Sequence, residues 1–255
     1  MSPVSVKPLV RLEDVTKRFG GIEAVDHVTF QVKRGTILGL VGSDGAGKST
    51  LLRMAATMIK PSSGRILIDD LDVVNRKRQV KAMIGYMPQR FGLYHDLTVG
   101  ENLDFFMDIF GIVGKERQRR RDRYLGFSNL LPFLNRLAGD LSGGMKQKLG
   151  LACVLVHQPT LLILDEPTNG VDPVSRQEFW DILLDMRQDG MTIFISTAYL
   201  DEGEKCDLLA LMHRSRVLEV STPTRVQGNF PNLEEAMIYR IQQVDEGLIH
   251  EGFQH

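Results

Sequence analysis

The feature that most constrains the fold is a glycine-rich segment that directly follows an apolar run. Residues 37–41 are all apolar or glycine, which is typical of a strand covered on both faces. Residues 42–49 read Gly-Ser-Asp-Gly-Ala-Gly-Lys-Ser and fit G-x-x-x-x-G-K-[ST], and apolar residues recur at helical spacing over residues 48–59. This order of strand, loop and helix predicts a phosphate-binding loop in an α/β fold, rather than a glycine-rich turn that binds nothing.

The residue types of this loop suit a polyanion, because glycines let several backbone N–H groups point inward and the helix start adds a positive dipole end. We expect Lys48 to reach the β- and γ-phosphates of a nucleotide and the Ser49 hydroxyl to bind Mg²⁺. Asp44 is unusual, since a carboxylate beside a triphosphate costs energy unless it points outward, as we expect here. The candidate nucleotide-binding residues of the loop are Gly42, Ser43, Asp44, Gly45, Ala46, Gly47, Lys48, Ser49 and Thr50.

A second apolar strand supplies the carboxylates that such a loop requires. Residues 161–164 read Leu-Leu-Ile-Leu and are followed by Asp165 and Glu166. We expect Asp165 to hold Mg²⁺ and Glu166 to orient or deprotonate an attacking water. Two acids at a strand end are also compatible with solvated surface charges, but the preceding phosphate loop favours the catalytic interpretation.

Composition limits the remaining classes of protein. The 255 residues carry 31 basic and 32 acidic side chains, so the net charge of −1 gives no whole-chain argument for nucleic-acid binding, and we expect no such partner. Two cysteines exclude a disulfide framework and a four-thiolate zinc site. The longest apolar run, residues 149–156, is far shorter than the roughly 20 residues of a spanning helix. Residues 1–15 lack the apolar core of a signal peptide, so we expect a cytoplasmic location.

Hydrophobic patterning predicts a P-loop α/β core with an antiparallel β subdomain near the N-terminus and an inserted helical lobe. Strands are expected at residues 9–12, 28–32, 37–41, 66–68, 84–87, 161–164 and 192–195, and twice within 209–220. Helices are expected at residues 48–59, 103–112, 144–156 and 175–186. We therefore divide a single domain, residues 1–255, into a nucleotide-binding core (1–90 and 158–222), a helical lobe (91–157), and a C-terminal helix and tail (223–255) whose residues 242–255 are weakly patterned.

One further motif carries a resemblance. Residues 141–147, Leu-Ser-Gly-Gly-Met-Lys-Gln, resemble the signature motif of ABC-type ATPases, the ATP-binding subunits of ABC transporters, and the resemblance extends over roughly residues 9–220. It implies that Ser142, Gly143 and Gly144 bind the γ-phosphate of ATP held by a second ABC ATPase domain, identical or different, in a head-to-tail dimer. It further implies hydrolysis of Mg·ATP that powers export through an integral membrane permease, on the cytoplasmic face of the plasma (inner) membrane.

The resemblance assigns roles to three other residues. Phe19 matches an aromatic residue that stacks on adenine, although a strand-end phenylalanine is also compatible with core packing. Gln89 matches a glutamine that contacts Mg²⁺ and the catalytic water and links hydrolysis to the membrane domain. Asp172 matches a loop that touches the opposite protomer. Together with the residues above, the expected catalytic set is Lys48, Gln89 and Glu166, and the expected metal ligands are Ser49, Gln89 and Asp165.

One position departs from the family pattern. The family has a histidine after the strand that follows the acidic pair, where it contacts the γ-phosphate, and this sequence has Ala198 there. Loss of one preorganised donor to a transferring phosphoryl group typically slows the reaction by ~10²–10³. We therefore expect intact ATP binding with reduced turnover at this site. The absence of the histidine would be explained by an asymmetric pair, in which the signature motif of this chain serves a partner domain that has its own histidine.

Several alternatives stay open. A soluble ABC-type ATPase acting on ribosomes would carry longer arms than the interval between Gln89 and Ser142 allows, and a non-hydrolysing regulatory module is supported by Ala198 alone. The basic run at residues 115–123 is compatible with an anionic partner but favours a solvated helix. The apolar residues Phe91, Leu93 and Tyr94 fit either a docking patch for a membrane subunit or packing inside the lobe.

Overall fold

The computed structural model describes residues 7–252, with side chains as far as residue 245. Its larger sheet has the strand order β10-β9-β3-β8-β7-β6, parallel except for the antiparallel β9–β10 pair. Its strands are β3 (Ile37–Gly42), β6 (Ile84–Met87), β7 (Leu161–Asp165), β8 (Thr192–Thr197), β9 (Leu208–His213) and β10 (Arg216–Ser221). The smaller sheet is antiparallel, in the order β2-β1-β4-β5, with β1 (Pro8–Phe19), β2 (Ile22–Lys33), β4 (Ser63–Ile68) and β5 (Leu71–Asp72).

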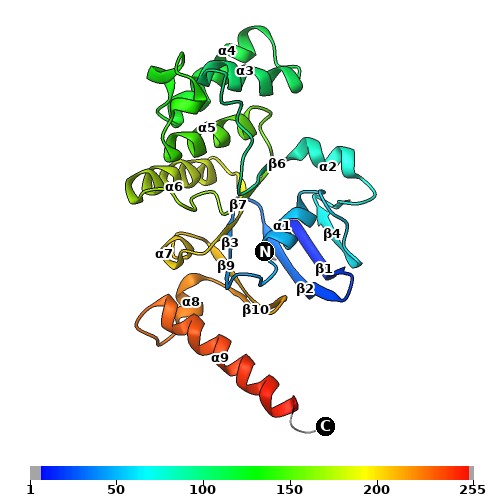
Figure 1. Ribbon diagram of the computed structural model, residues 1–255. Coiled ribbons are helices and arrows are strands. Elements are labelled where there is room, and N and C mark those ends of the chain that lie inside the picture. Colours follow the sequence, from blue (N-terminus) through cyan, green and yellow to red (C-terminus); the bar gives the residue numbers. More distant parts are fainter. Residues whose placement is uncertain (1–6, 253–255) are drawn as a thin grey trace, which may run out of the picture.

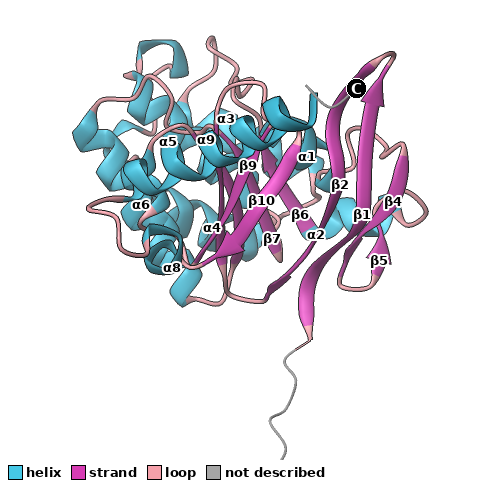
Figure 2. Cartoon of the chain, turned by 90° about the horizontal axis from the view of Figure 1, so that it is seen from below, coloured by secondary structure: helices cyan, strands magenta, loops and turns pink. Residues whose placement is uncertain are grey.

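The helices lie around these two sheets (Figures 1 and 2). They are α1 (Lys48–Ala55), α2 (Lys77–Met83), α3 (Val99–Ile109), α4 (Gly114–Phe127), α5 (Gly143–Leu155), α6 (Pro173–Gln188), α7 (Leu200–Gly203), α8 (Pro223–Gln227) and α9 (Leu233–Gly252), with short 3₁₀ turns at Leu131–Phe133 and Ala138–Asp140. In Figure 1 the helices α3, α4 and α5 gather at one end of the molecule, the small sheet lies at its side, and α8 and α9 lie at the opposite end. Among residues 7–252, none of the helices has the length and apolar character needed to cross a bilayer.

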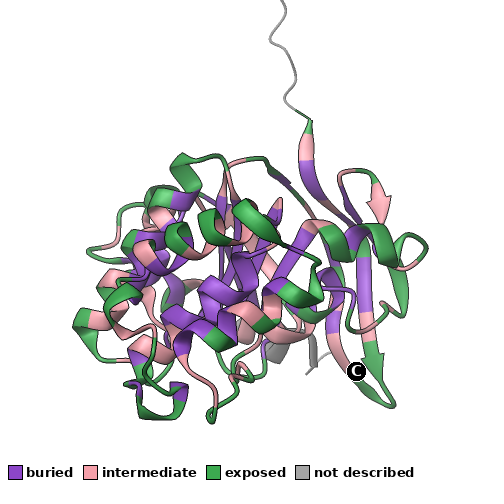
Figure 3. Cartoon of the chain, turned by 90° about the horizontal axis from the view of Figure 1, so that it is seen from above, coloured by how far each residue is buried: buried purple, intermediate pink, exposed green. Residues whose placement is uncertain are grey.

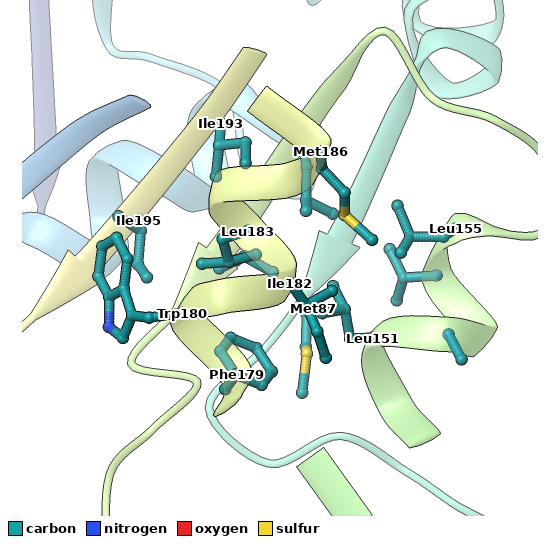
Figure 4. Close-up of a cluster of buried hydrophobic side chains, with 14 of the residues drawn as sticks. Met87, Leu151, Leu155, Phe179, Trp180, Ile182, Leu183, Met186, Ile193 and Ile195 are labelled. Atoms are coloured by element: carbon teal, nitrogen blue, oxygen red, sulfur yellow. The ribbon is translucent and has the colours of Figure 1, made fainter. Parts of the chain in front are cut away.

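The central strands are buried on both faces, as their continuous apolar sequences predict. In β3, Ile37 and Val41 belong to one hydrophobic cluster and Leu38 and Leu40 to the other. The first cluster joins the large sheet to α3, α5 and α6, and Figure 4 shows Ile182 and Leu183 of α6 in its middle, with Trp180 to one side beside Ile195. The second cluster joins the opposite face to α1 and the small sheet. In Figure 3 the buried segments accordingly lie mainly in the interior of the molecule.

The predicted fold class is confirmed, and the differences concern the lengths of elements and short elements that were not predicted, among them α2 and β5. The first two strands are each 12 residues long, because β1 continues past a bulge at Asp14, whose φ is 52°. The helix expected over residues 48–59 ends at Ala55, since Thr57 adopts a φ of 61°. The weakly patterned residues 242–252 continue α9, and residues 253–255 lie outside the described part of the chain. None of residues 242–245 is buried, whereas Leu233, Ala236 and Met237 earlier in the helix are, so the apolar pattern fades along α9.

Candidate functional site

The glycine-rich loop connects β3 to α1 and surrounds a pocket of about 160 Å³, lined by Ala24, residues 44–50 and Glu166. Two of its glycines are required by close backbone approaches. Gly42 has a φ of 151°, and a Cβ there would lie 2.0 Å from the Met212 carbonyl oxygen; at Gly47 the φ is 100° and the Ala24 carbonyl oxygen would lie at 2.3 Å. Strands β2 and β9 thus fix the loop from behind, so its inner surface is preorganised.

Lys48 lies inside this loop and is only 4% exposed. Its ammonium group donates to the carbonyl oxygens of Gly42, at 2.7 Å, and Ser43, at 3.0 Å. These carbonyls satisfy a buried cation that would otherwise be costly, and they hold it at the pocket that a polyanion would enter. Asp44 is exposed at the rim of the pocket, where its carboxylate stays solvated.

Asp165 ends β7 directly behind this pocket and is 1% exposed. One carboxylate oxygen, Oδ1, accepts hydrogen bonds from the hydroxyls of Ser49 at 2.7 Å and Ser196 at 2.9 Å. The other, Oδ2, is buried without any hydrogen-bond partner. Leaving such an oxygen unpaired costs about 1–3 kcal/mol. A carboxylate oxygen in this condition beside a hydroxyl is a donor set that Mg²⁺ prefers, so the residues fit this ion.

Glu166 follows in a strained conformation that aims its carboxylate at the pocket. Its φ is 48°, a left-handed value that costs a non-glycine residue of order 1–3 kcal/mol. Its N–H is shared between the Ser196 hydroxyl, at 3.0 Å, and the Ser196 carbonyl, at 3.2 Å. Its Oε2 accepts from the side-chain amides of Gln89, at 2.8 Å, and Asn169, at 3.1 Å. The structure therefore brings Gln89, Ser49, Lys48 and both acids together.

The signature segment lies elsewhere. Ser142 caps α5, its hydroxyl accepting from the Met145 N–H at 3.3 Å, and Ser142 and Gly143 are exposed. A Cβ at Gly143 would meet nothing within 4 Å, whereas one at Gly144 would lie 2.3 Å from Cβ of Ser175 on α6. Helix α5 packs on α3, α4, α6 and β6, and α1 packs on β2, β3, β7 and β8 (Figure 1). The chain therefore does not bring Ser142–Gly144 to its own phosphate loop.

Phe19 and Asp172 also lie on the surface. Phe19 ends β1 and is 49% exposed, with the Lys17 ammonium 4.8 Å from its ring centre. It is therefore not a core residue, which removes the alternative interpretation of this side chain. Asp172 caps α6 by accepting from the Ser175 N–H at 2.9 Å, and this backbone hydrogen bond lowers the pKa of the Asp172 carboxyl.

Ala198 is exposed immediately after β8. The lining of the pocket contains no histidine among the residues that the structure describes. His213 does not replace one, because its Nε2 lies 2.9 Å from Oδ1 of Asp245 on α9. The structure thus provides no imidazole at the position where the family pattern has one.

Sequence reasoning missed Ser196 and Asn169, both of which hold the acid pair. Ser196 is paired in register with Asp165 across the parallel strands β7 and β8. Aligning the two predicted strands by their ends would have placed the Ser196 hydroxyl beside the acids. Asn169 has no comparable signal, because its contact with Glu166 depends on the local turn after β7.

The structure bears on the alternatives left open for the basic run and for the apolar residues after Gln89. In the basic run, Arg117 and Arg121 both pair with Asp104, which supports an intramolecular role for this charge. Phe91 and Leu93 pack against the core, and the Phe91 ring stacks on Phe106 at 5.6 Å. Tyr94 is instead 47% exposed. Both cysteines are buried, and burial raises the pKa of each thiol, so neither is a ready nucleophile.

Comparison with known proteins now identifies the family. The profile of the family described as "ABC transporter" matches residues 25–169. The chain belongs to the ABC transporter family. It is 42% identical over 258 residues to the probable multidrug ABC transporter ATP-binding protein YbhF of Escherichia coli K12, which covers 94% of this chain but 44% of that protein. It is 38% identical to the bacitracin transport ATP-binding protein BcrA of Bacillus licheniformis, over 83% of this chain and 69% of that protein.

The fold also matches solved ATP-binding cassettes. One, described as the dimeric structure of a post-hydrolysis state bound to ADP and phosphate, superposes with a TM-score of 0.75 at 26% identity, covering 84% of this chain and 98% of that one. The expected family and its P-loop α/β fold are confirmed by these comparisons. The chain spans less than half the length of YbhF, so activity and partners remain matters for proposal.

Proposed function

We propose that this ABC cassette binds and hydrolyses Mg·ATP to drive export by a membrane partner. The observation that carries the proposal is the unpaired Oδ2 of Asp165 beside Ser49, at the base of a phosphate-loop pocket that Glu166 also lines. In this proposal Lys48 and the loop N–H groups bind the phosphates, and Phe19 stacks on the adenine. Ser49, Gln89 and Asp165 hold Mg²⁺, which neutralises charge on the phosphates when bound.

Glu166 is the general base of this proposal. Its carboxylate is held by Gln89 and Asn169, so Gln89 can orient both the base and a water between them. The rigid left-handed turn at Glu166 keeps this geometry before substrate arrives. A non-hydrolysing module would have no use for a base held in this strained position, so the hydrolytic function is favoured.

The second half of the site comes from another ABC ATPase domain, of the same or a different chain. Ser142, Gly143 and the start of α5 present free N–H groups on an exposed helix N-terminus, and Gly143 leaves open space for a phosphate to approach. The similar cassette described as dimeric supports a pair of ATPase domains, and the head-to-tail arrangement is what the resemblance of the signature motif implies. The residues of the helical lobe, 91–157, are thus proposed to serve the partner's ATP, and residues 1–90 and 158–222 this chain's own, with residues 223–255 forming a C-terminal helix and tail.

An integral membrane permease is the proposed second partner, which places the chain on the cytoplasmic face of the inner membrane. Exposed apolar side chains follow Gln89 and continue along α3: Tyr94, Phe105 and Ile109 are 47%, 36% and 60% exposed. Such a patch is a candidate docking surface for a membrane subunit, and its proximity in sequence to Gln89 would couple docking to the base. The transport functions named for YbhF and BcrA support a role in transport over an action on ribosomes.

Ala198 makes the proposed turnover slow at the site built on this chain's own loop. All other expected groups are present, so nucleotide binding is retained and the chemical step loses one donor. In a pair with a different ATPase domain, the signature of this chain would still serve a fully equipped partner site.

The test is calorimetry with Mg·ATP on the full chain, followed by phosphate release. We expect binding in the micromolar to millimolar range and slow hydrolysis, both removed by Lys48→Ala. Absence of any binding heat at millimolar Mg·ATP would overturn the proposal. Co-purification with ribosomes instead of a membrane protein would overturn the transport function alone.

A further inference from the structure

Glu202 is a buried acid that the phosphate loop, the acid pair and the signature motif leave unexplained. It lies on α7 and is 1% exposed. Its Oε2 accepts from the Thr197 hydroxyl at 2.5 Å, and its Oε1 accepts from the Thr168 hydroxyl at 2.7 Å. Burial of a carboxylate is costly unless it is paired and hydrogen-bonded, so these two contacts define its place in the fold.

Thr197 transmits the first contact to the backbone around Ala198. Because its hydroxyl proton points to Glu202, a lone pair of the same oxygen remains for the Tyr199 N–H, which donates to it at 3.0 Å. This hydrogen bond closes a turn with Ala198 at its centre. The orientation of position 198 therefore depends on which way Glu202 turns the Thr197 hydroxyl.

Thr168 transmits the second contact to the loop that follows Glu166. The Thr168 carbonyl accepts from the Val171 N–H at 3.1 Å, and the next residue, Asn169, contacts the Glu166 carboxylate at 3.1 Å. Glu202 thus fixes the residue beside the one that holds the proposed base. A shift of Thr168 would move Asn169 and, through it, the Glu166 carboxylate.

Arg176 of α6 adds a third connection to the same group. Its Nε lies 3.9 Å from Glu202 Oε1, its Nη2 is 3.2 Å from Asp201, and its guanidinium lies 4.3 Å from the Tyr199 ring centre. The cation balances the buried charge and packs on the turn that contains Ala198. One carboxylate therefore joins β8, the loop after β7, and α6.

We propose that Glu202 is a positioning residue that sets the Ala198 turn and the Glu166–Asp172 loop in register with each other. This proposal rests on the proposed hydrolysis of Mg·ATP and adds to it the residue by which the two segments beside the terminal phosphate are coupled. It assigns Glu202 no contact with nucleotide; its effect passes through Thr197 and Thr168.

The first experiment compares Glu202→Gln with Glu204→Gln, a matched change at an exposed acid two residues away. In Glu202→Gln we expect kcat of Mg·ATP hydrolysis to fall about ten-fold, because the variant loses a hydrogen bond to a charged group. The Kd for Mg·ATP should change less than about two-fold, because neither segment belongs to the phosphate loop. Glu204→Gln should match the wild type. An unchanged kcat in Glu202→Gln overturns the proposal.

A double-mutant cycle separates positioning from loss of stability. Introduced alone, Ala198→His should raise kcat. In the Glu202→Gln background most of that gain should vanish, since the new imidazole would no longer be directed at the terminal phosphate. A gain of the same size in both backgrounds overturns the proposal. Thr197→Val and Thr197→Ser supply the rescue pair: only the serine variant, which keeps the hydroxyl, should retain the wild-type kcat.

Amide hydrogen exchange tests the same coupling without catalysis. In nucleotide-free protein, Glu202→Gln should speed exchange in both residues 168–172 and residues 197–201, while Glu204→Gln speeds neither. Unchanged exchange in either segment overturns the inference, whatever the ATPase rate. Faster exchange in both segments of a chain that binds no Mg·ATP would instead uphold the coupling and reject the proposed function.

Discussion

The two proposed phosphate-binding surfaces of this chain differ in how completely they are built. The phosphate loop is fixed by β2 and β9 from behind; Lys48 is buried inside it, and Asp165 and Ser196 are buried and hydrogen-bonded to each other. At the start of α5, Ser142 and Gly143 are exposed, and the Ser142 hydroxyl caps the helix by accepting from the Met145 N–H. The first surface is preorganised within one chain, whereas the second, in the proposed dimer, would be completed by another molecule. Variants of each should therefore fail in different ways.

The largest expected effect lies on the preorganised surface. Glu166→Gln should lower kcat by ~10²–10⁴, because the amide is not a base, while Mg·ATP binding is retained. Phosphate release and calorimetry on the same samples measure the two quantities. Glu204→Gln, at an exposed acid, is the control. Hydrolysis at the wild-type rate in Glu166→Gln would show that the base lies elsewhere.

The next largest effect is expected from a substitution that introduces a hydrogen-bond donor at position 198, on the same surface. Ala198→His should raise kcat by up to ~10²–10³, since an imidazole would meet the charge that develops on the phosphoryl group. Ala198→Asn supplies a matched polar side chain of different reach and should raise kcat less. Steady-state phosphate release measures both. If the wild type already turns over as fast as Ala198→His, the idea of an impaired site is wrong.

The difference between the two surfaces also explains what the sequence could predict. The loop, Asp165 and Glu166 follow apolar strands, so a motif and a local element coincide and the fold class could be predicted from them. Ser196 and Glu202 form contacts between segments separated in sequence, and no local pattern marks them. The contact of Asn169 with Glu166 depends on the conformation of the turn after β7, which no motif predicted. Phe19 and Ser142 could be named only by resemblance, because what they would bind is not part of the chain.

On the exposed surface, the adjacent glycines of the signature should separate stability from assembly. Gly144→Ala would place a Cβ 2.3 Å from that of Ser175, so we expect it to destabilise the fold by about 1–3 kcal/mol. Gly143→Ala meets open space and should leave thermal unfolding unchanged. In a Glu166→Gln background, however, its methyl group should weaken ATP-dependent dimerisation several-fold, as measured by analytical ultracentrifugation. A Gly143→Ala chain that dimerises like its parent would remove this surface from the proposed site.

The smallest expected effect returns to the buried side of the comparison. Ser196→Ala would remove the hydroxyl that donates to Asp165 and accepts from the Glu166 N–H. Asp165 keeps Ser49 and the Glu166 N–H keeps the Ser196 carbonyl, so the cost should be about 1–2 kcal/mol in urea unfolding. When nucleotide is present, Mg²⁺ should offset part of this cost, because it would bind the Asp165 carboxylate that loses a hydrogen bond in the alanine variant. Ser196→Thr keeps the hydroxyl and is the control; equal stability of the alanine and threonine variants, with and without Mg·ATP, would mean that the acid pair is held by its backbone alone.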